Sequence, residues 1–298
     1  MSTELLIAIG AGLGGMLGWG LADFFAKKAI DRIGDVASLV WSHLFGTAIF
    51  IALALTSSLL RQQPLFVPRD IQTWILLGFF GALQAAVYLL VYRGFGKGQV
   101  AVLNPVFSSF SGLTAALSIL VFGEAVSAYR LLALAIIFAG ILLTSIDVEA
   151  LRSTRLRLAH IPGLKEVALA TVLAAVWTIL WDQFVGGKDW LSYALFMYVF
   201  MTATILVVSG FQRLKLRVVS PDIWKFLILI GLCETAAYLA ISLGYSETSL
   251  TSVVVLLSGA FSLPTIILAR TFLHERTTAA QTVGTITIII GIALLPWN

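Results

Sequence analysis

Two rows of polar side chains lie inside long apolar stretches, and they are the residues best placed to do chemistry. The first row is Gln84, Tyr88 and Tyr92, and the second is Glu234, Tyr238, Ser242 and Tyr245. Residues three or four apart share one face of a helix. A polar face turned toward lipid would leave donors and acceptors unpaired. Both rows are therefore expected to face protein or a wet cavity, and we predict that they form a binding site.

Glu234 is the most informative single position. A carboxyl group deep in a membrane span is costly, so it counts as a functional hypothesis by default. It could bind substrate or carry a proton that couples transport. A structural role is the alternative, in which a neutral Glu234 shares a hydrogen bond with Gln84 or a tyrosine hydroxyl. The sequence leaves both open.

Aromatic residues add to the predicted site from two further stretches. Trp19 comes from the first apolar run, and Trp177 and Trp181 come from the sixth. Rings with a few polar groups suit an aromatic or zwitterionic small molecule, whose cation can lie on a ring face. Asp23 and Asp182 lie nearer the ends of their runs, where structural roles are favoured, with Lys27 a natural partner for Asp23.

Three other polar residues, two serines and a histidine, also lie within apolar runs. Ser108 and Ser258 are small hydroxyl residues at matching places in the fourth and ninth runs, and we expect them to line the site. His43 in the second run is better explained as a packing or interhelical hydrogen-bonding residue.

Two prolines lie in those same fourth and ninth runs. Pro105 and Pro264 each remove a backbone hydrogen bond and are predicted hinges, although a static kink would look the same in sequence.

Composition assigns the chain to the membrane. The 298 residues are 59% hydrophobic and 11% charged, with a mean hydropathy of +1.00. Such a chain has too little polar surface to cover a water-soluble globule. The single Cys233 lies in an apolar run, which argues against a disulfide framework or thiolate metal site. We expect no metal and no cofactor. The net charge of +4 lies in short loops, so no nucleic-acid partner is expected.

Ten apolar runs are long enough to cross a bilayer as helices. Their approximate extents are residues 5–26, 36–57, 71–92, 100–122, 130–146, 165–185, 191–211, 223–245, 250–273 and 279–297. The runs are too long and too uniformly apolar for membrane strands. In the first run, Gly10, Gly14, Gly18, Ala22 and Ala26 recur at every fourth position. This small face favours close helix packing, with cavity lining as the alternative.

The chain contains the same pattern twice. Gly81, Tyr88 and Gly94 align with Gly231, Tyr238 and Gly244 at a shift of 150, and Glu124 aligns with Glu275 at a shift of 151. Five helices per copy is an odd number, so the second copy must be inverted in the membrane. We predict an all-α membrane protein with ten transmembrane helices as two inverted five-helix repeats, 1–147 and 165–298. The linker 148–164 is an interfacial segment or a plain tether.

Basic residues set the expected orientation. Of the 19 Lys and Arg residues, 15 lie in the odd-numbered connections. The positive-inside tendency places those connections in the cytoplasm and both termini on the other side.

The paired pattern resembles the drug/metabolite transporter superfamily, specifically its ten-helix EamA-type carriers. The resemblance rests on Gly18-Trp19-Gly20 followed by Lys27, on Phe122-Gly123-Glu124 and Leu273-His274-Glu275, and on Gly140 and Gly291. Within the superfamily, the chain looks most like the bacterial exporters of aromatic amino acids known as YddG. The resemblance implies a basket of helices around a central cavity. Val255 stands where the first repeat has Pro105, a departure from the expected symmetry.

These observations predict a secondary transporter of the inner (plasma) membrane and not an enzyme. It would export amino acids, aromatic or apolar ones first, or related small metabolites by alternating access. Its partners would be a small-molecule substrate and the lipid bilayer, with a monomer as the working expectation. No phosphate-binding GxxxxGK[ST] pattern and no HExxH motif occurs. An intramembrane enzyme and a carrier of other metabolites or drugs remain the alternatives.

Overall fold

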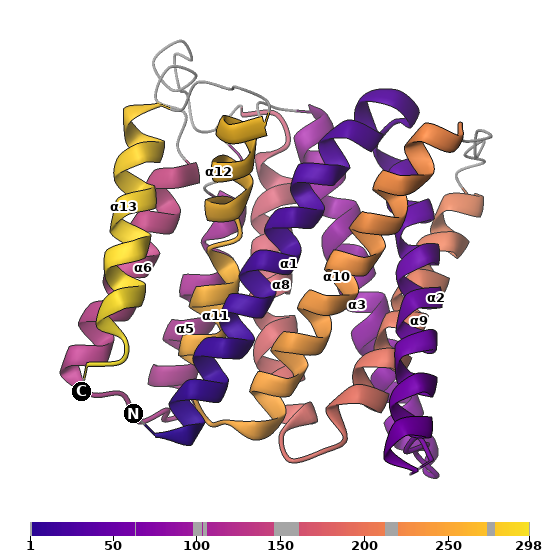
Figure 1. Cartoon of the computed structure of the whole chain (residues 1–298), viewed down its shortest axis with the longest axis horizontal. Coiled ribbons are helices and arrows are strands. Elements are labelled where there is room, and N and C mark those ends of the chain that lie inside the picture. The colour runs from indigo at the N-terminus through magenta and orange to yellow at the C-terminus, as the bar shows by residue number, and fades with distance from the viewer. Residues whose placement is uncertain are drawn as a thin grey trace.

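The computed structural model describes residues 2–62, 64–97, 103, 106–145, 161–211, 220–272 and 278–297. These residues form a bundle of helices that run roughly side by side, with both termini at one end (Figure 1). The helices of the first half are α1 (Thr3–Ile33), α2 (Asp35–Arg61), α3 (Ile71–Lys97), α5 (Phe110–Leu120) and α6 (Ala128–Ser145). Those of the second half are α8 (Leu164–Val185), α9 (Trp190–Phe211), α10 (Pro221–Glu247), α11 (Thr251–Gly259), α12 (Ser262–Phe272) and α13 (Ala279–Leu294).

The ten predicted runs all contain helix. Within the described residues, eight helical stretches are long and apolar enough to cross a membrane, and two shorter apolar helices, Val106–Leu120 and Ala279–Leu294, accompany them. Large apolar side chains lie exposed on the outside of the bundle, including Leu60, Ile71 and Leu120. An exposed apolar surface of this kind suits lipid.

Side chains at the helix ends satisfy backbone donors that the helix cannot pair itself. Ser2 accepts a bond from the Leu5 N–H at the start of α1, and Asp70 accepts one from the Thr73 N–H at the start of α3. The Thr73 bond holds the pKa of the Asp70 carboxyl below its usual value. Thr278 and Gln281 form a reciprocal capping box at the start of α13.

The two halves pack against each other as an inverted repeat requires. Helix α1 lies against α10 and, reciprocally, α3 lies against α8; α2 packs on α10 where α9 packs on α3. The closing helices α6 and α13 pair with each other at one edge of the bundle (Figure 1). Each helix of one half thus finds its main neighbours in the other half, so the halves are not separate globules.

Both copies of the fourth predicted run are broken at equivalent places. In the first copy a turn at Ser109 precedes α5, and in the second a turn at Ala260 and Phe261 separates α11 from α12. Pro264 lies just after this second break, where a residue lacking an N–H costs least. The other predicted hinge, Pro105, lies outside the described residues.

The small face of α1 serves close packing on α10 at the positions where the two helices cross. A Cβ atom added at Gly18 would lie 2.6 Å from the Cys233 carbonyl oxygen, and one at Gly14 would lie 2.7 Å from the Ala240 Cβ. Ala22 is buried against Ile223, Leu227 and Ile230. Gly10 differs, because nothing lies within 4 Å of an added Cβ there.

Gly18→Ala is therefore expected to destabilise the bundle, because the new methyl group must push α1 away from the α10 backbone. Overpacking of this kind costs about 1–3 kcal/mol. Gly10→Ala is the matched control in the same helix and should be neutral or slightly stabilising, since alanine is the better helix former. The measurement is the thermal unfolding midpoint in detergent. Equal midpoints for the two variants would contradict this packing.

Candidate functional site

Tyr238 of α10 lies at the centre of a buried aromatic group made by both halves. Its ring meets those of Trp19, Tyr198 and Trp177 edge to face, with centroids 5.8, 5.5 and 6.2 Å away. Such geometry matches the preferred arrangement of aromatic pairs. The side chain of Tyr238 is fully buried. We call Trp19, Tyr88, Trp177, Tyr198 and Tyr238 the aromatic centre.

The Tyr238 hydroxyl connects the two rows of polar side chains that the sequence analysis singled out. Gln84 Nε2 of α3 donates to the Tyr238 hydroxyl at 2.9 Å, and that hydroxyl lies 3.4 Å from the Tyr88 hydroxyl. Tyr238 also lies 3.9 Å from the Met201 sulfur. The two rows, on α3 and α10, therefore contact each other across the halves. Tyr92, the third member of the first stripe, has a side chain outside the described part of the structure.

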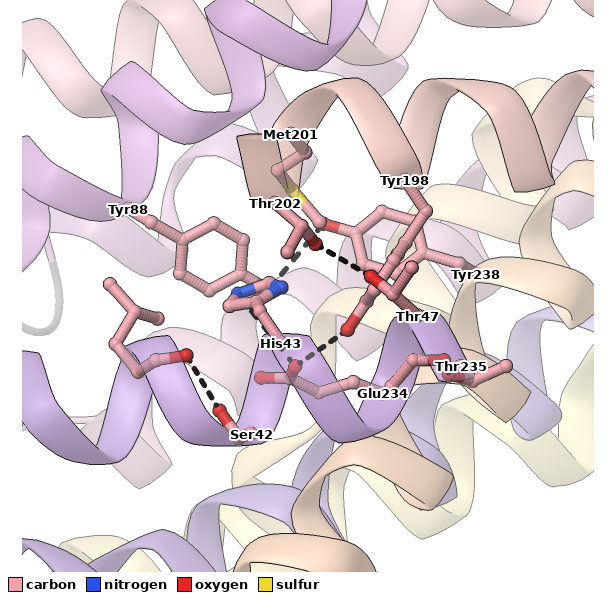
Figure 2. A network of polar contacts seen from close by, with 12 residues as sticks. Ser42, His43, Thr47, Tyr88, Tyr198, Met201, Thr202, Glu234, Thr235 and Tyr238 are labelled. Atoms are coloured by element: carbon pink, nitrogen blue, oxygen red, sulfur yellow. Dashed lines mark hydrogen bonds and ion pairs between the residues drawn. The ribbon is translucent and has the colours of Figure 1, made fainter. Parts of the chain in front are cut away.

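Glu234 lies one turn from Tyr238 and forms a second cluster with residues of α2 and α9 (Figure 2). The Tyr198 hydroxyl donates to Glu234 Oε2 at 3.2 Å, and His43 Nε2 lies 3.8 Å from the same oxygen. The glutamate thus bonds a tyrosine hydroxyl, one of its two predicted structural partners, while Gln84 bonds Tyr238 instead. The whole cluster is buried, with 7% of Glu234 and none of His43 exposed.

Close helix contacts bring these residues together. A Cβ added at Gly46 would lie 2.3 Å from the Tyr198 hydroxyl, and one at Gly231 would lie 2.5 Å from the Gly46 nitrogen. Thr235 donates to the Gly46 carbonyl oxygen at 3.1 Å, and Thr47 pairs with Thr202 at 2.9 Å. Only glycine at these two positions allows α2 to approach α10 and α9 closely enough for His43 to reach Glu234.

Trp181 extends the aromatic centre along α8. Its ring is stacked on Trp177 at 5.7 Å and 9°, and its Nε1 donates to the Ser242 hydroxyl at 3.2 Å. Trp177 Nε1 donates to the Phe80 carbonyl oxygen at 3.0 Å. These bonds fix both indoles between α3, α8 and α10.

The two predicted serines lie elsewhere. Ser108 pairs with Ser145 at 3.1 Å, and Ser258 donates to the Val255 carbonyl oxygen and lies against α1 at Gly15. Both are buried, and no contact with the aromatic centre is recorded for them in the described residues. Their role in binding substrate stays a prediction.

Several buried polar atoms of the site have no hydrogen-bond partner among the described residues. They are Trp19 Nε1, Gln84 Oε1 and both ring nitrogens of His43. Leaving a buried donor or acceptor unpaired costs about 1–3 kcal/mol. Of these four atoms, the Trp19 Nε1 donor and the Gln84 Oε1 acceptor belong to residues that contact Tyr238, where a small polar ligand could pair with them.

Sequence reasoning did not single out Tyr198 or place His43 beside Glu234. Tyr198 carries a hydroxyl in the middle of an apolar run, which was the available signal. The sequence places His43 in the middle of an apolar run but does not indicate its partner, because that depends on which helix packs against it. Asp23 is exposed, and the side chain of its expected partner Lys27 lies outside the described residues. Glu124 connects the first half to the start of α11, where it accepts a hydrogen bond from the Ser252 N–H at 2.9 Å.

The comparisons with known proteins agree with this arrangement. The EamA-like transporter family matches the chain twice, over residues 6–146 and 162–296. The chain belongs to the EamA-like transporter family. It is accordingly a multi-pass membrane protein, and the family indicates a transporter of small molecules. The comparisons do not show which branch of the family the chain belongs to, so the likeness to the YddG exporters stays a prediction.

A solved structure shares the fold of this EamA-like chain. It is titled only "Crystal structure of protein", with a TM-score of 0.76, 15% sequence identity, and coverage of 97% of this chain and 96% of that one. At that identity the likeness concerns the fold alone. The search of curated proteins returned no match.

Tyr238→Phe tests the hydrogen bonds at the centre, because it removes the hydroxyl and keeps the ring contacts. The Gln84 amide then loses its acceptor, so the free energy of unfolding should fall by about 1–3 kcal/mol. Tyr129→Phe on an exposed face of α6 is the control and should change stability by less than about 0.5 kcal/mol. The measurement is thermal unfolding in detergent. Identical stability of Tyr238→Phe and the native chain would refute the assigned bonds.

Proposed function

We propose that this chain is a secondary carrier that exports amino acids, with aromatic or apolar side chains preferred, by alternating access. The aromatic centre carries the proposal. It is formed by α1, α3, α8, α9 and α10, so it lies between the halves, where inverted-repeat carriers bind substrate. Both termini, and the bundle end that carries them, are proposed to face away from the cytoplasm.

The chemistry of the centre favours a substrate with a ring or branched side chain and a zwitterionic head. Trp19, Trp177 and Tyr238 offer apolar faces and edges to such a side chain. The unpaired Trp19 Nε1 is a donor suited to a carboxylate, and the unpaired Gln84 Oε1 is an acceptor suited to an ammonium group. A ligand that satisfies both would offset the penalty of burying them.

The packing implies movement during transport. Tyr238 and Trp181 are fully buried and their rings are in contact with neighbours from both halves. Substrate can reach the centre only when the halves separate on one side. The helix breaks at Ser109 and at Ala260–Phe261 would let the fourth and ninth spans bend, with Pro264 at the second break.

Glu234 and His43 are the proposed coupling pair. The two side chains are buried within 3.8 Å of each other, and a single proton held there would neutralise the carboxylate or charge the imidazole. The Tyr198 hydroxyl donates to the same carboxylate, so protonation of Glu234 would weaken this hydrogen bond. A substrate that displaces this proton would couple its own movement to a proton gradient.

Flux from proteoliposomes tests the carrier. Vesicles loaded with labelled phenylalanine should release it with saturable kinetics, and a pH gradient should change the rate. Glu234→Gln should abolish the gradient effect, because an amide cannot exchange a proton. Glu247→Gln, which removes an exposed carboxylate at the end of the same helix, should respond as the native chain does.

Other results have defined meanings. Saturable flux that ignores the gradient in both proteins would indicate facilitated diffusion with a structural Glu234. Absence of flux for every amino acid would contradict the proposal and redirect the search to other metabolites or drugs, and then to an intramembrane enzyme.

A further inference from the structure

A cavity of about 430 Å³ lies apart from the aromatic centre, at the end of the bundle that carries the N-terminus. Its walls come from both halves, at the ends of α5, α8 and α10 and the start of α11. The lining residues are Ser118, Phe122, Gly123, Glu124, Ala125, Asp182, Gln183, Gly186, Tyr245, Thr248, Ser249 and Thr251. Glu4 of α1 bonds Ser249, which ties the cavity to the end where the chain begins. We call it the end cavity.

The lining of the end cavity is acidic. Glu124 and Asp182 are its ionisable carboxyl residues, and none of the lining residues is Lys, Arg or His. Lys188, the basic residue closest to Asp182 in sequence, points elsewhere. Its ammonium bonds the Phe184 carbonyl oxygen and lies 4.2 Å from the centre of the Phe184 ring. The charge of the cavity is therefore uncompensated by its own walls.

The two carboxylates are not equivalent. Glu124 accepts three hydrogen bonds: Oε2 accepts from the Ser118 hydroxyl and from the Ser252 N–H, and Oε1 accepts from the Ser252 hydroxyl at 2.5 Å. The two bonds to Ser252 join the halves. Asp182 accepts from the neutral donors Gln183 and Thr251. A carboxylate has about four acceptor positions. Asp182 therefore keeps acceptor capacity for a ligand.

Tyr245 supplies the second observation. Its side chain is 2% exposed and lines the cavity near Asp182, and its hydroxyl forms no hydrogen bond within the part of the chain that the structure describes. Asp182 is likewise 6% exposed. The buried carboxylate of Asp182 is stabilised by a donor or a positive charge, and the oxygen of the Tyr245 hydroxyl can accept a hydrogen bond from the same ligand. An ammonium group provides both, and the tyrosine ring can also attract it.

We propose that the end cavity binds the ammonium group of a small primary amine, with Asp182 as its acceptor and Tyr245 beside it. The volume is suited to a molecule of amino-acid size. This inference deepens the proposed function by adding a second site, on the path between the aromatic centre and the end of the bundle. Asp182 immediately follows Trp181, so the two sites share α8. A substrate leaving the centre would meet the acidic site next.

Binding of three probes to the purified chain in lipid nanodiscs tests the site, measured by isothermal titration calorimetry. Phenethylamine carries the ring and the ammonium group, phenylalanine adds the carboxylate, and hydrocinnamate lacks the ammonium group. Phenethylamine should bind the native chain, and Asp182→Asn should weaken it at least tenfold. Hydrocinnamate binding should be the same in both proteins.

Two further variants make the result specific. Tyr245→Phe removes only the hydroxyl and should weaken phenethylamine several-fold, which keeps the test decisive if Asp182→Asn fails to fold. Glu247→Gln removes an exposed carboxylate outside the lining and should bind as the native chain does. Unchanged affinity in Asp182→Asn or in Tyr245→Phe would overturn the proposal. An equal loss in Glu247→Gln would also overturn it, because bulk surface charge would then explain binding.

The outcome is separable from that of the transport assay. Asp182-dependent amine binding without amino-acid flux would sustain the end cavity and remove the proposed export function. Phenylalanine flux, together with amine binding that does not depend on Asp182, would support the export function and overturn the proposed amine site.

Discussion

The structure depends on the cost of leaving a polar group unpaired in lipid. Helices α3 and α10 carry glutamine, glutamate and tyrosine side chains that no bilayer could solvate, so each helix must turn them toward protein. They find each other: Gln84 bonds Tyr238, and Glu234 bonds Tyr198. This requirement brings the two halves together around one centre. It also explains why the halves contact each other more than they contact themselves along α1, α3, α8 and α10.

The interface between the halves is closely packed along α1 and α10 but contains a cavity at one end. Helix α1 lies against α10 from one end to the other, with Ala11 at Gly244, Gly18 at Ala237, and Ala22 in the cluster near Ile230. At the end near the N-terminus, however, α5, α8, α10 and α11 leave the end cavity between them. Glu124 connects the first half to the start of α11 beside this cavity. The contact beside the end cavity consists of a few hydrogen bonds, whereas the α1–α10 contact is a continuous, closely packed surface that contains glycines.

The spans and stripes could be predicted from sequence because length, apolar content and four-residue spacing are local properties. Each predicted run contains helix, and the meeting of Gln84 with Tyr238 followed from the inverted repeat. A tyrosine partner for Glu234 was predicted, but neither Tyr198 nor His43 could be identified as its neighbour, because they come from helices whose rotation depends on the close crossing at Gly46 and Gly231. Ser108 pairs with Ser145, a partner that the sequence did not indicate, and its place in the substrate site stays a prediction. The end cavity could not be predicted from the sequence, because it forms from helix ends that are far apart in the chain.

Alternating access between the two halves is the central claim, and a distance measured across the end cavity tests it most directly. Spin labels would be placed at Ala125 and Glu247, one exposed residue on each half at this end, in a background with Cys233→Ala. Double electron–electron resonance in nanodiscs would then compare the chain alone with the chain in saturating phenylalanine. The account predicts two distance populations whose ratio shifts when phenylalanine is added. A single population, unchanged by phenylalanine, would contradict it.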